Sequence, residues 1–393
     1  MDIPLTSEQE LMRDSIRRLV ARDILPVLGK HDGNTPLPKP ACLAILAKLA
    51  KVGLTAARLP VAAGGPGISM LDYGILFEQI PAAIGISLLS HESCVARLHA
   101  ECNEAQRARF LPDLIAGRTL GCTGSTEPDT GSDPRGIKTR ITRQDDSLVI
   151  NGRKMWITNV SACDLMIVTG VDDREGAGAH QVIKVVVERE RSPFETREID
   201  TIGLRQGMLG EAVFENCRVP AGNLIESPTG GTEMLKSTWA VNRPLIGLLA
   251  VQLAQQAFDI AIDFAGVRKQ FGQPIAGHQL VQKNLSDIVT AITASRLMCH
   301  HALTLIDRGW PAAGASAMAK RFAQNACQEA VWQAMNVLGA MGLSTEARLE
   351  ALYRDIRMLP VPDGTNEILA LIHGRELTGL AAFRGTGNPS DTR

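Results

Sequence analysis

The chain of 393 residues lacks the features that would place it among membrane or nucleic-acid-binding proteins. Its formal net charge is −1, so no long-range field attracts nucleic acid or an acidic bilayer. A helix that crosses a bilayer needs roughly 18 consecutive apolar residues. The best apolar run, at 245–250, is soon interrupted by Gln252 and Gln255. The sequence therefore predicts neither a nucleic-acid partner nor a membrane partner.

The sequence also lacks signals for secretion, disulfide bonding, metal binding and a Rossmann nucleotide site. Its N-terminus has no basic-then-apolar segment, and Thr6 with Gln9 is instead typical of a helix capping box. The eight cysteines, spread from Cys42 to Cys327, form no CxxC pair and no Cys/His cluster. No GxGxxG follows a predicted strand. We therefore expect a cytoplasmic protein with buried cysteines and no bound metal.

Hydrophobic periodicity divides the chain into three segments and a tail. Residues 1–118 are predicted to be helical, because apolar side chains recur at helical spacing from Met12 to Ile24. Residues 119–232 change to short alternating runs typical of strands. Residues 233–385 return to helical sequence, in which 244–267 is apolar nearly all round, as in the middle of a bundle. The polar end, 386–393, is expected to be a disordered tail.

The middle segment carries the clearest local signal. Residues 148–150, then Asn151 and Gly152, then 153–158 predict a hairpin, because Asn-Gly supplies the positive φ of a tight two-residue turn. Further strands are predicted at 165–171, 182–187 and 211–214.

Five motifs make this outline specific. They are TEPDTGSD at 126–133, INGRKMWITN at 150–159, RKQFGQPI at 268–275, LGAMG at 338–342, and YRD at 353–355 with DGTNEI at 363–368. In order and spacing they resemble TEPxxGSD, NGxKxWITN, RKQFGxPI, LGGxG and YRD…EGTxxI of the acyl-CoA dehydrogenase family, along nearly the whole chain. The resemblance implies an α+β multidomain fold with an N-terminal α-helical domain, a middle antiparallel β-domain and a C-terminal four-helix bundle.

The resemblance also implies a homotetramer that binds FAD between the β-domain and the C-terminal bundle. The residues matching the flavin-ring contacts are Ser125, Thr126, Trp156, Ile157 and Thr158. Those matching contacts to a neighbouring subunit's FAD are Arg268, Gln270, Phe271, His278 and Gln279. The remaining FAD contacts match Asn336, Gly339, Ala340, Thr365 and Glu367. Hydroxyl and backbone donors suit the flavin pyrimidine, a Trp gives a flat wall, and an Arg fork suits a diphosphate. Alone, Thr126 would read as a turn residue and Trp156 as core; the neighbouring motifs favour the cofactor role.

The catalytic base departs from the family pattern. Family members remove an α-proton from an acyl thioester while the β-hydrogen leaves as hydride to the flavin, so they need a carboxylate beside Cα. Most place a Glu directly before Gly-Thr, where this chain has Asp363, and a minority place it where this chain has Asn242. Asp363 is therefore the candidate base, although it is shorter by ~1 Å, a loss that can cost about 10²-fold in rate. Pro360 and Pro362 are expected to hold this strap extended and to restore the reach.

Three functions follow from these matches. The first is dehydrogenation of an acyl thioester, with an electron-transferring flavoprotein reoxidising the flavin. The second is an oxidase-type relative that uses Asp on a more acidic substrate and O2 as acceptor, as in nitroalkane oxidases; the Arg of that pattern is replaced here by Ala370. The third is a flavin-binding member without dehydrogenation, in which Asp363 only forms a turn.

The expected substrate is a short or polar acyl thioester. His91 and Glu92 match positions near the closed end of the family's acyl pocket, where a buried polar group needs a polar partner. Gly85 stands where glutaryl-CoA dehydrogenases carry an Arg, which disfavours a dicarboxylate. Ala240 replaces an acidic residue among the CoA contacts, so a carrier-protein thioester stays open beside acyl-CoA. The residues matching substrate contacts are Ser132, His91, Asn242, Arg243, Gly364 and Arg375.

Overall fold

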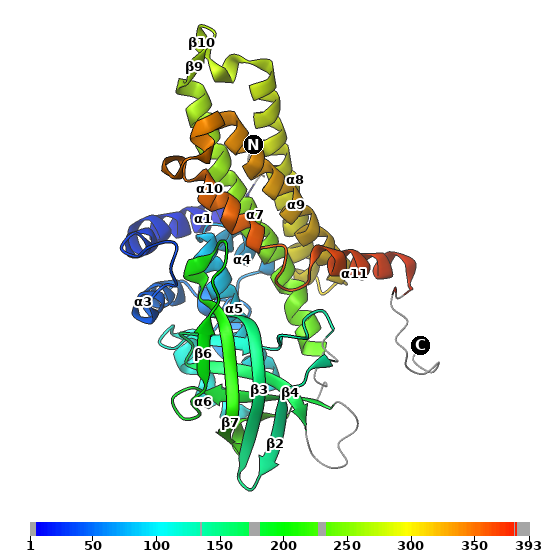
Figure 1. Ribbon diagram of the computed structural model, residues 1–393. Coiled ribbons are helices and arrows are strands. Elements are labelled where there is room, and N and C mark those ends of the chain that lie inside the picture. The colour runs from blue at the N-terminus through cyan, green and yellow to red at the C-terminus, as the bar shows by residue number, and fades with distance from the viewer. Residues whose placement is uncertain (1–4, 134–135, 173–180, 227–232, 381, 383–393) are drawn as a thin grey trace.

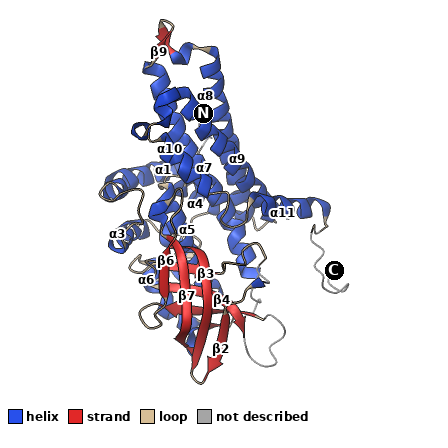
Figure 2. Cartoon of the chain, in the orientation of Figure 1, coloured by secondary structure: helices blue, strands red, loops and turns tan. Residues whose placement is uncertain are grey.

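Helices from both ends of the chain flank a β-sheet formed by its middle third, in a computed structural model that describes residues 5–133, 136–172, 181–226, 233–380 and 382 (Figures 1 and 2). The predicted order of helical, β and helical domains is confirmed. The predicted tail at 386–393 lies outside the described residues.

The N-terminal helices have the bounds α1 Ser7–Leu19, α2 Leu25–Leu28, α3 Lys39–Ala50, α4 Met70–Phe77, α5 Ala82–Glu101 and α6 Glu104–Ile115. Helix α5 contacts α6, the sheet and α7, while α1 packs on α4 and α4 packs on the bundle helices α7 and α8. A π-helical turn at Val20–Ile24 joins α1 to α2. The predicted capping box begins α1: Thr6 Oγ1 accepts from Gln9 N (3.2 Å), and Gln9 Oε1 accepts from Thr6 N (3.1 Å).

The sheet is mostly antiparallel, but the pairs β1–β4 and β2–β4 are parallel. Its strand order is β6-β7-β3-β2-β4-β5-β8, with β1 beside β4. The bounds are β1 Gly121–Gly124, β2 Arg140–Gln144, β3 Ser147–Thr158, β4 Leu165–Asp172, β5 Val182–Glu188, β6 Glu195–Glu198, β7 Leu209–Pro220 and β8 Leu224–Ile225.

The hairpin predicted at Asn151-Gly152 is wrong. Strand β3 runs without interruption from Ser147 to Thr158, and the chain turns instead between β2 and β3, at Asp145 (φ 51°). Gly152 has φ 152° and lies in a register shift against β7, where a Cβ would approach Thr139 Oγ1 to 2.6 Å. The glycine thus serves a close approach between β3 and Thr139 rather than a tight turn.

Three long antiparallel helices make the C-terminal bundle, with two shorter helices packed on α9. The bounds are α7 Glu233–Val267, α8 Gln279–Asp307, α9 Ala313–Leu338, α10 Leu349–Met358 and α11 Asn366–Thr378. A small hairpin, β9 Lys269–Gln270 and β10 Gln273–Pro274, joins α7 to α8 at the end of the bundle far from the sheet (Figure 1).

Among the described helices, only α7 carries an apolar stretch of membrane-spanning length. Its stretch Ser237–Val267 is long and apolar enough to cross a membrane by length and composition, and 61% of its most apolar window is buried within the protein. That burial arises from packing against α8, α9 and α5. The apolarity is therefore accounted for by its place in the middle of the bundle.

The eight cysteines are free and buried, as predicted. Burial raises the pKa of the Cys42 thiol to about 11 and that of Cys327 to about 12. These side chains are therefore small neutral core residues. Among the described residues, no group of three His, Cys, Asp or Glu side chains could hold a metal ion.

Candidate active site

Two of the sequence motifs meet in space at the end of β3. The backbone N–H of Met155 donates to the carbonyl of Thr126 (3.0 Å). Lys154 reaches across the same junction, with Nζ donating to the Ser125 carbonyl (3.2 Å) and to Glu127 Oε1 (2.7 Å). Lys154 and Glu127 are both buried, so this ion pair ties the loop at 125–127 to the strand.

Glu127 acts as the anchor of its loop. Its carboxylate accepts from the backbone N–H of Lys138 (2.7 Å) and from both the N–H and the hydroxyl of Thr139 (2.9 and 2.6 Å). Burial alone would raise the pKa of Glu127, but the hydrogen bonds from Lys154, Thr139 and Lys138 hold it below its usual value. The loop is thus fixed around an ionised carboxylate, which leaves Ser125 and Thr126 in a defined position.

Trp156 is turned outward from the sheet. A register shift between Lys154 and Ile157 marks an irregularity in the β3–β7 pairing, and Trp156 within it has φ 61°. Its side chain is 51% exposed, whereas Ile157 is buried. A large flat ring held outward on a rigid strand is suited to pack against an isoalloxazine ring.

The other end of the same motif is tied to α5. Buried Asn159 exchanges two hydrogen bonds with Ser87, whose hydroxyl donates to Asn159 Oδ1 (2.6 Å) and whose carbonyl accepts from Nδ2 (2.8 Å). Ser90, one turn further along α5, donates to the carbonyl of Thr158 (3.2 Å). The predicted ring contacts Ser125, Thr126, Trp156, Ile157 and Thr158 therefore form one rigid set that fits a flavin.

A second set of predicted FAD residues lies at the far end of the bundle. Arg268, Gln270 and Phe271 belong to the exposed β9–β10 hairpin, in which Phe271 is 93% exposed, and His278 and Gln279 follow it. Because α9 runs antiparallel to α8, its C-terminal part with Asn336 lies toward this end too, and Gly339 and Ala340 directly follow α9. One copy of the chain does not bring the hairpin to β3, the strand that carries Trp156 (Figure 1).

The candidate base lies between the bundle helices and the start of α11. Asn242 Nδ2 donates to Asp363 Oδ2 (2.7 Å), and Arg243 Nε donates to the backbone carbonyl of Asp363 (3.1 Å). Asn242 and Arg243 are buried on α7. Asp363 has φ 54° and Gly364 φ 106°, so the chain turns sharply here and the extended strap expected from Pro360 and Pro362 is wrong. Asp is among the few non-glycine residues that adopt this left-handed conformation readily.

A buried polar network continues from Asn242 into the N-terminal domain. Asn242 Oδ1 accepts from Arg58 Nη2 (2.6 Å) and from the Ser93 hydroxyl (3.1 Å). Arg58 Nε lies 2.5 Å from Glu92 Oε2, and Arg58 N donates to Glu92 Oε1 (3.0 Å). Burial raises the pKa of Glu92, and the Arg58 ion pair opposes that rise. The two sequence positions that the family uses for its base thus join one network.

His91 is not a substrate contact, in contrast to the prediction. Its Nδ1 accepts from the Gly121 N–H (3.1 Å) and its Nε2 lies 3.1 Å from the Leu114 carbonyl, so both ring nitrogens are used by backbone groups of other elements. The side chain is fully buried, and desolvation lowers its pKa to about 4. A neutral ring that joins α5 to α6 and β1 is a structural residue, because no nitrogen remains for a ligand.

The remaining predicted residues are divided between the turn and the surface. The Gly364 carbonyl faces Lys320, and Thr365 caps α11 by accepting from Ile368 N (3.4 Å). Ser132, Glu367 and Arg375 are exposed.

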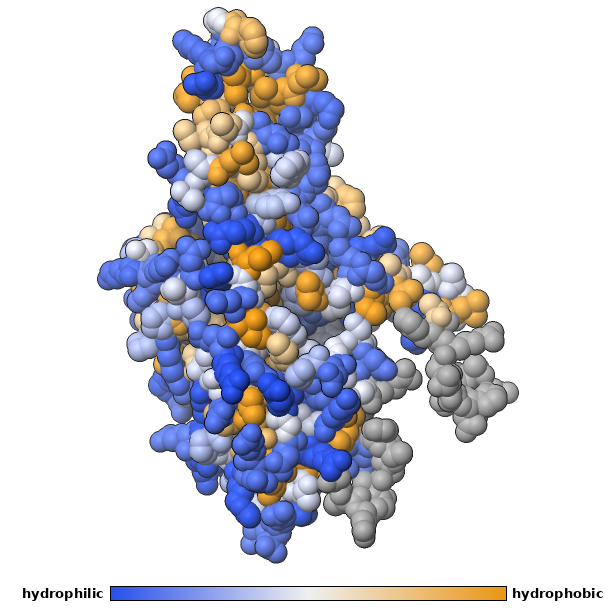
Figure 3. Space-filling model, in the orientation of Figure 1, coloured by the Kyte–Doolittle hydropathy of each residue, from blue (hydrophilic) through white to orange (hydrophobic). Residues whose placement is uncertain are grey.

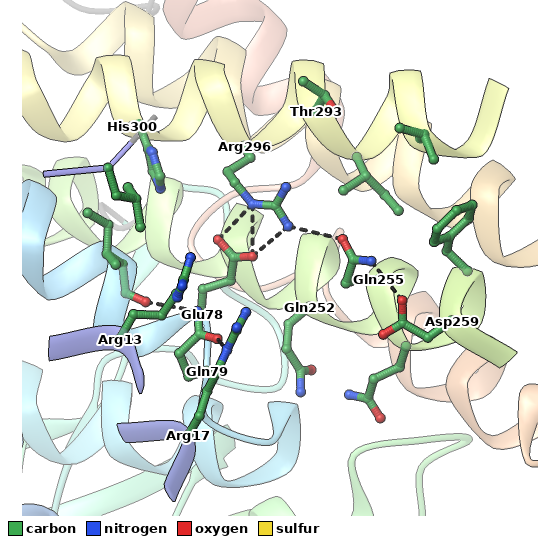
Figure 4. Close-up of a pocket in the computed structure, with 16 residues that line it drawn as sticks. Arg13, Arg17, Glu78, Gln79, Gln252, Gln255, Asp259, Thr293, Arg296 and His300 are labelled. Carbon is green, nitrogen blue, oxygen red and sulfur yellow. Dashed lines mark hydrogen bonds and ion pairs between the residues drawn. The ribbon is translucent and has the colours of Figure 1, made fainter. Parts of the chain in front are cut away.

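A polar cavity of about 430 Å³ lies between α1, α4, α7 and α8 (Figure 4). Arg296 on α8 donates to both carboxylate oxygens of Glu78 (2.9 and 3.1 Å) and to Gln255 (3.4 Å), which in turn donates to Asp259 (2.9 Å). None of the residues that line the cavity is a predicted site residue. The cavity is therefore distinct from the candidate active site.

Three polar residues near Asp363 were not predicted from the sequence: Arg58, Ser93 and Lys320. Arg58 did carry a signal, because it is an isolated charge in the apolar stretch 52–63. Lys320 stands beside Arg321, and Ser93 beside Glu92, so neither is distinguished in the sequence. Only the fold brings Arg58 and Ser93 to Asn242.

Known proteins match the chain over almost its whole length. Family models described as the N-terminal, middle and C-terminal domains of acyl-CoA dehydrogenase match residues 6–118, 122–217 and 229–378. Cyclohex-1-ene-1-carbonyl-CoA dehydrogenase of Geobacter metallireducens is 33% identical over 380 residues, which cover 95% of this chain and 98% of that protein. Probable acyl-CoA dehydrogenase YngJ of Bacillus subtilis is 32% identical over 382 residues, covering 96% and 100%.

Solved structures also match the fold of this chain over almost its whole length. Butyryl-CoA dehydrogenase from Megasphaera elsdenii superposes with a TM-score of 0.87 at 27% identity, covering 96% of this chain and 100% of that one. The expectation of FAD as cofactor is confirmed at the level of the family. The chain therefore belongs to the acyl-CoA dehydrogenase family of FAD-dependent oxidoreductases that act on CH–CH bonds.

Proposed function

We propose that this protein dehydrogenates a short or polar acyl thioester between Cα and Cβ, with Asp363 as the base that takes the α-proton. The observation that carries the proposal is the hydrogen bond of 2.7 Å from Asn242 Nδ2 to Asp363 Oδ2. It orients a carboxylate at the position where most members of the family place their Glu. FAD, when bound, supplies the two-electron acceptor for the hydrogen that leaves Cβ.

Two residues of α7 hold Asp363 in the orientation that proton removal requires. Asn242 holds one carboxylate oxygen, and Arg243 holds the backbone carbonyl of the same residue (3.1 Å). In the described part of the chain no donor binds Oδ1, which leaves this oxygen for the α-proton. Both supports come from α7, the rigid middle helix of the bundle, so the base is fixed before substrate arrives.

The polar network beside the base supports a short or polar acyl group. Glu92, Arg58 and Asn242 form a continuous chain of contacts that ends at Asp363. The end of a long alkyl chain would gain no hydrogen bond or ion pair beside these polar groups, whereas a polar acyl group could. Buried Tyr73 adds a hydroxyl that has no hydrogen-bond partner in the described residues, and its pKa is raised by burial and by Glu92. This hydroxyl is a donor that a polar acyl group could use.

Close packing disfavours a dicarboxylate substrate. A Cβ added at Gly85 would approach Leu249 Cδ2 to 2.5 Å, so α5 and α7 leave little room for a side chain there. An Arg at this position, as glutaryl-CoA dehydrogenases carry, would need Leu249 to move. A CoA thioester is the primary expectation, and Ala240 keeps a carrier-protein thioester as the alternative.

A homotetramer would complete the cofactor site. The hairpin residues Arg268 and Phe271 lie at the end of the bundle far from Trp156, so a second copy must supply them to a flavin bound at the sheet (Figure 1). Apolar side chains gather at this end and along α11 (Figure 3). They include Val267, Phe271, Leu280, Leu377 and Leu380. Exposed apolar surface of this kind marks protein interfaces.

The flavin would be reoxidised by an electron-transferring flavoprotein, with O2 as the alternative.

A panel of thioesters tests the substrate class. Butyryl-CoA, a hydroxyacyl-CoA and octanoyl-CoA are mixed anaerobically with the purified holoprotein, and bleaching of the flavin is followed. We expect fast bleaching by the first or second compound and slow bleaching by octanoyl-CoA. Fast reduction by octanoyl-CoA would contradict the short-or-polar assignment. H2O2 release with a nitroalkane, and no bleaching by any thioester, would favour the oxidase-type alternative.

A further inference from the structure

Lys320 is a fully buried lysine on α9 whose ammonium faces the segment that carries Asp363. Nζ donates to the carbonyl of Pro362, to that of Gly364 (2.7 Å) and to that of Pro360 (3.4 Å). An ammonium has three N–H donors, and three carbonyls match them here. Two of these carbonyls directly flank Asp363, so Lys320 binds the turn on both sides of the candidate base.

The turn that Lys320 binds has a backbone conformation that few non-glycine residues adopt. Asp363 and Gly364 have consecutive positive φ angles, 54° and 106°. Asp adopts the left-handed region more readily than most residues, but the conformation persists only where its surroundings hold it. The ammonium bridging positions 360, 362 and 364 is one such constraint. Without it the turn would relax, and the carboxylate would move with it.

Helix α9 is itself fixed against the helix that holds the other side of the turn. Gly247 on α7 packs directly against α9, because a Cβ there would lie 3.4 Å from Ala323 Cβ and 3.7 Å from Lys320 Cα. Gln324, one turn after Lys320, donates to the Ile246 carbonyl on α7 (3.2 Å). Asp363 is therefore held from α7 through Asn242 and Arg243, and from α9 through Lys320, on one rigid unit.

We propose that Lys320 is a positioning residue for the base: its ammonium fixes the turn at 362–364 so that the short Asp side chain reaches the substrate α-carbon. This role rests on the proposed function of Asp363. Asp is one methylene shorter than Glu, so its carboxylate reaches the substrate only if the backbone at 362–364 is held closer. The contacts of Lys320 hold the backbone there. Lys320 itself does not contact the substrate.

The charge of Lys320 gives the proposal a pH signature. Burial lowers the pKa of Lys320, the Asp363 carboxylate opposes this and Arg243 adds to it, and the net pKa is about 7. These two groups, from the turn and from α7, are the charged groups that act on it. When the amine loses its proton, it keeps two N–H donors for three carbonyls. The turn therefore loosens, and flavin reduction slows, as pH rises through about 7.

The test compares holoenzymes of the wild type, Lys320→Met and Lys320→Arg, with exposed Lys283→Met as the control. Anaerobic flavin reduction by butyryl-CoA is measured in single turnovers from about pH 6 to about pH 9, together with FAD content and amide hydrogen exchange of residues 360–365. We expect Lys320→Met to keep FAD, to reduce it about 100-fold more slowly at unchanged half-saturating substrate, and to exchange faster at 360–365. Lys320→Arg should regain most of the rate without the decline above about pH 7, since Arg stays charged.

Two other outcomes would overturn the proposal. The first is a Lys320→Met enzyme with the wild-type rate and pH profile. The second is loss of fold and FAD in both Lys320→Met and Lys320→Gln with full retention in Lys320→Arg, because Lys320 would then serve stability alone. If the wild type is bleached by no thioester, the proposed function fails, and hydrogen exchange still decides whether Lys320 holds the turn.

Discussion

The side-chain amide of Asn242 donates a hydrogen bond of 2.7 Å to Oδ2 of Asp363. The contact joins the two positions at which the family can carry its catalytic carboxylate, one on the long helix α7 and one before α11. Here the first is an amide and the second a shortened acid. The pair is complementary, because an amide N–H stabilises the ionised carboxylate and fixes its direction.

Because these two side chains are in contact, the carboxylate should be exchangeable between them. Asp363→Asn combined with Asn242→Glu returns a carboxylate to the same site from α7. We expect the double variant to reduce its flavin at least about tenfold faster than Asp363→Asn alone, as measured by anaerobic single turnovers. Asn242→Glu alone should be slow, since two carboxylates in contact disfavour each other's ionised forms. A double variant that binds FAD but is no faster than Asp363→Asn would contradict the shared position.

The buried ring of His91 should make the protein sensitive to mild acid. Desolvation lowers the His91 pKa from its usual value to about 4 in the folded protein, so between about 6.5 and about 4 the unfolded chain binds the extra proton. Stability is thus fully present above about pH 6.5 and falls as pH drops through this window, by up to about 3 kcal/mol.

His91→Gln tests this acid sensitivity. The Gln amide keeps one acceptor for the Gly121 N–H and one donor for the Leu114 carbonyl, but it does not titrate. Urea unfolding at about pH 7 and about pH 5 measures the free energy of unfolding. Its decrease between the two pH values should be smaller in the variant than in the wild type. The exposed His301→Gln variant is the control and should behave as the wild type. Equal losses in His91→Gln and the wild type would rule out His91 as the cause.

The hairpin between α7 and α8 should matter for cofactor retention and assembly together. Arg268→Ala removes an exposed guanidinium that has no role in the core of its own chain, so the folded monomer should be retained. If this group binds the FAD of a neighbouring copy, the purified variant should have lost most of its FAD and should elute as a smaller species on size exclusion. Full FAD occupancy in an unchanged oligomer would exclude the contact between subunits.

The sequence predicted the fold class because the order of helical, β and helical segments follows from local periodicity. The motifs at Ser125 and Trp156 were each identified as short local patterns, but the contact between the loop and the strand joins residues 29 positions apart. The hairpin predicted at Asn151-Gly152 failed for a similar, nonlocal reason. Gly152 serves a close contact with Thr139, the residue before β2, and such an approach from another segment leaves no local trace in the sequence.

The site around Asp363 could be predicted only in part, because its supports come from distant segments. Asn242 was identified as a matching position, but its hydrogen bond to Asp363 joins residues 121 positions apart. Arg58 lies 184 positions from Asn242, and Lys320 42 positions from Pro362. The polar character of His91 was read as a ligand signal, whereas backbone groups at Leu114 and Gly121 use both nitrogens. The role of a buried polar residue can therefore be assigned only when its hydrogen-bond partners are known.

The central claim, that Asp363 is the base of a thioester dehydrogenase, is tested most directly by anaerobic flavin reduction in Asp363→Asn. The substitution keeps the size of the side chain and removes only its charge, so FAD should stay bound and the fold should be unchanged. We expect butyryl-CoA or a hydroxyacyl-CoA to bleach the wild-type flavin, and to leave that of Asp363→Asn oxidised over the same time, a loss of at least about 10³-fold. Bleaching of Asp363→Asn at the wild-type rate would contradict the account.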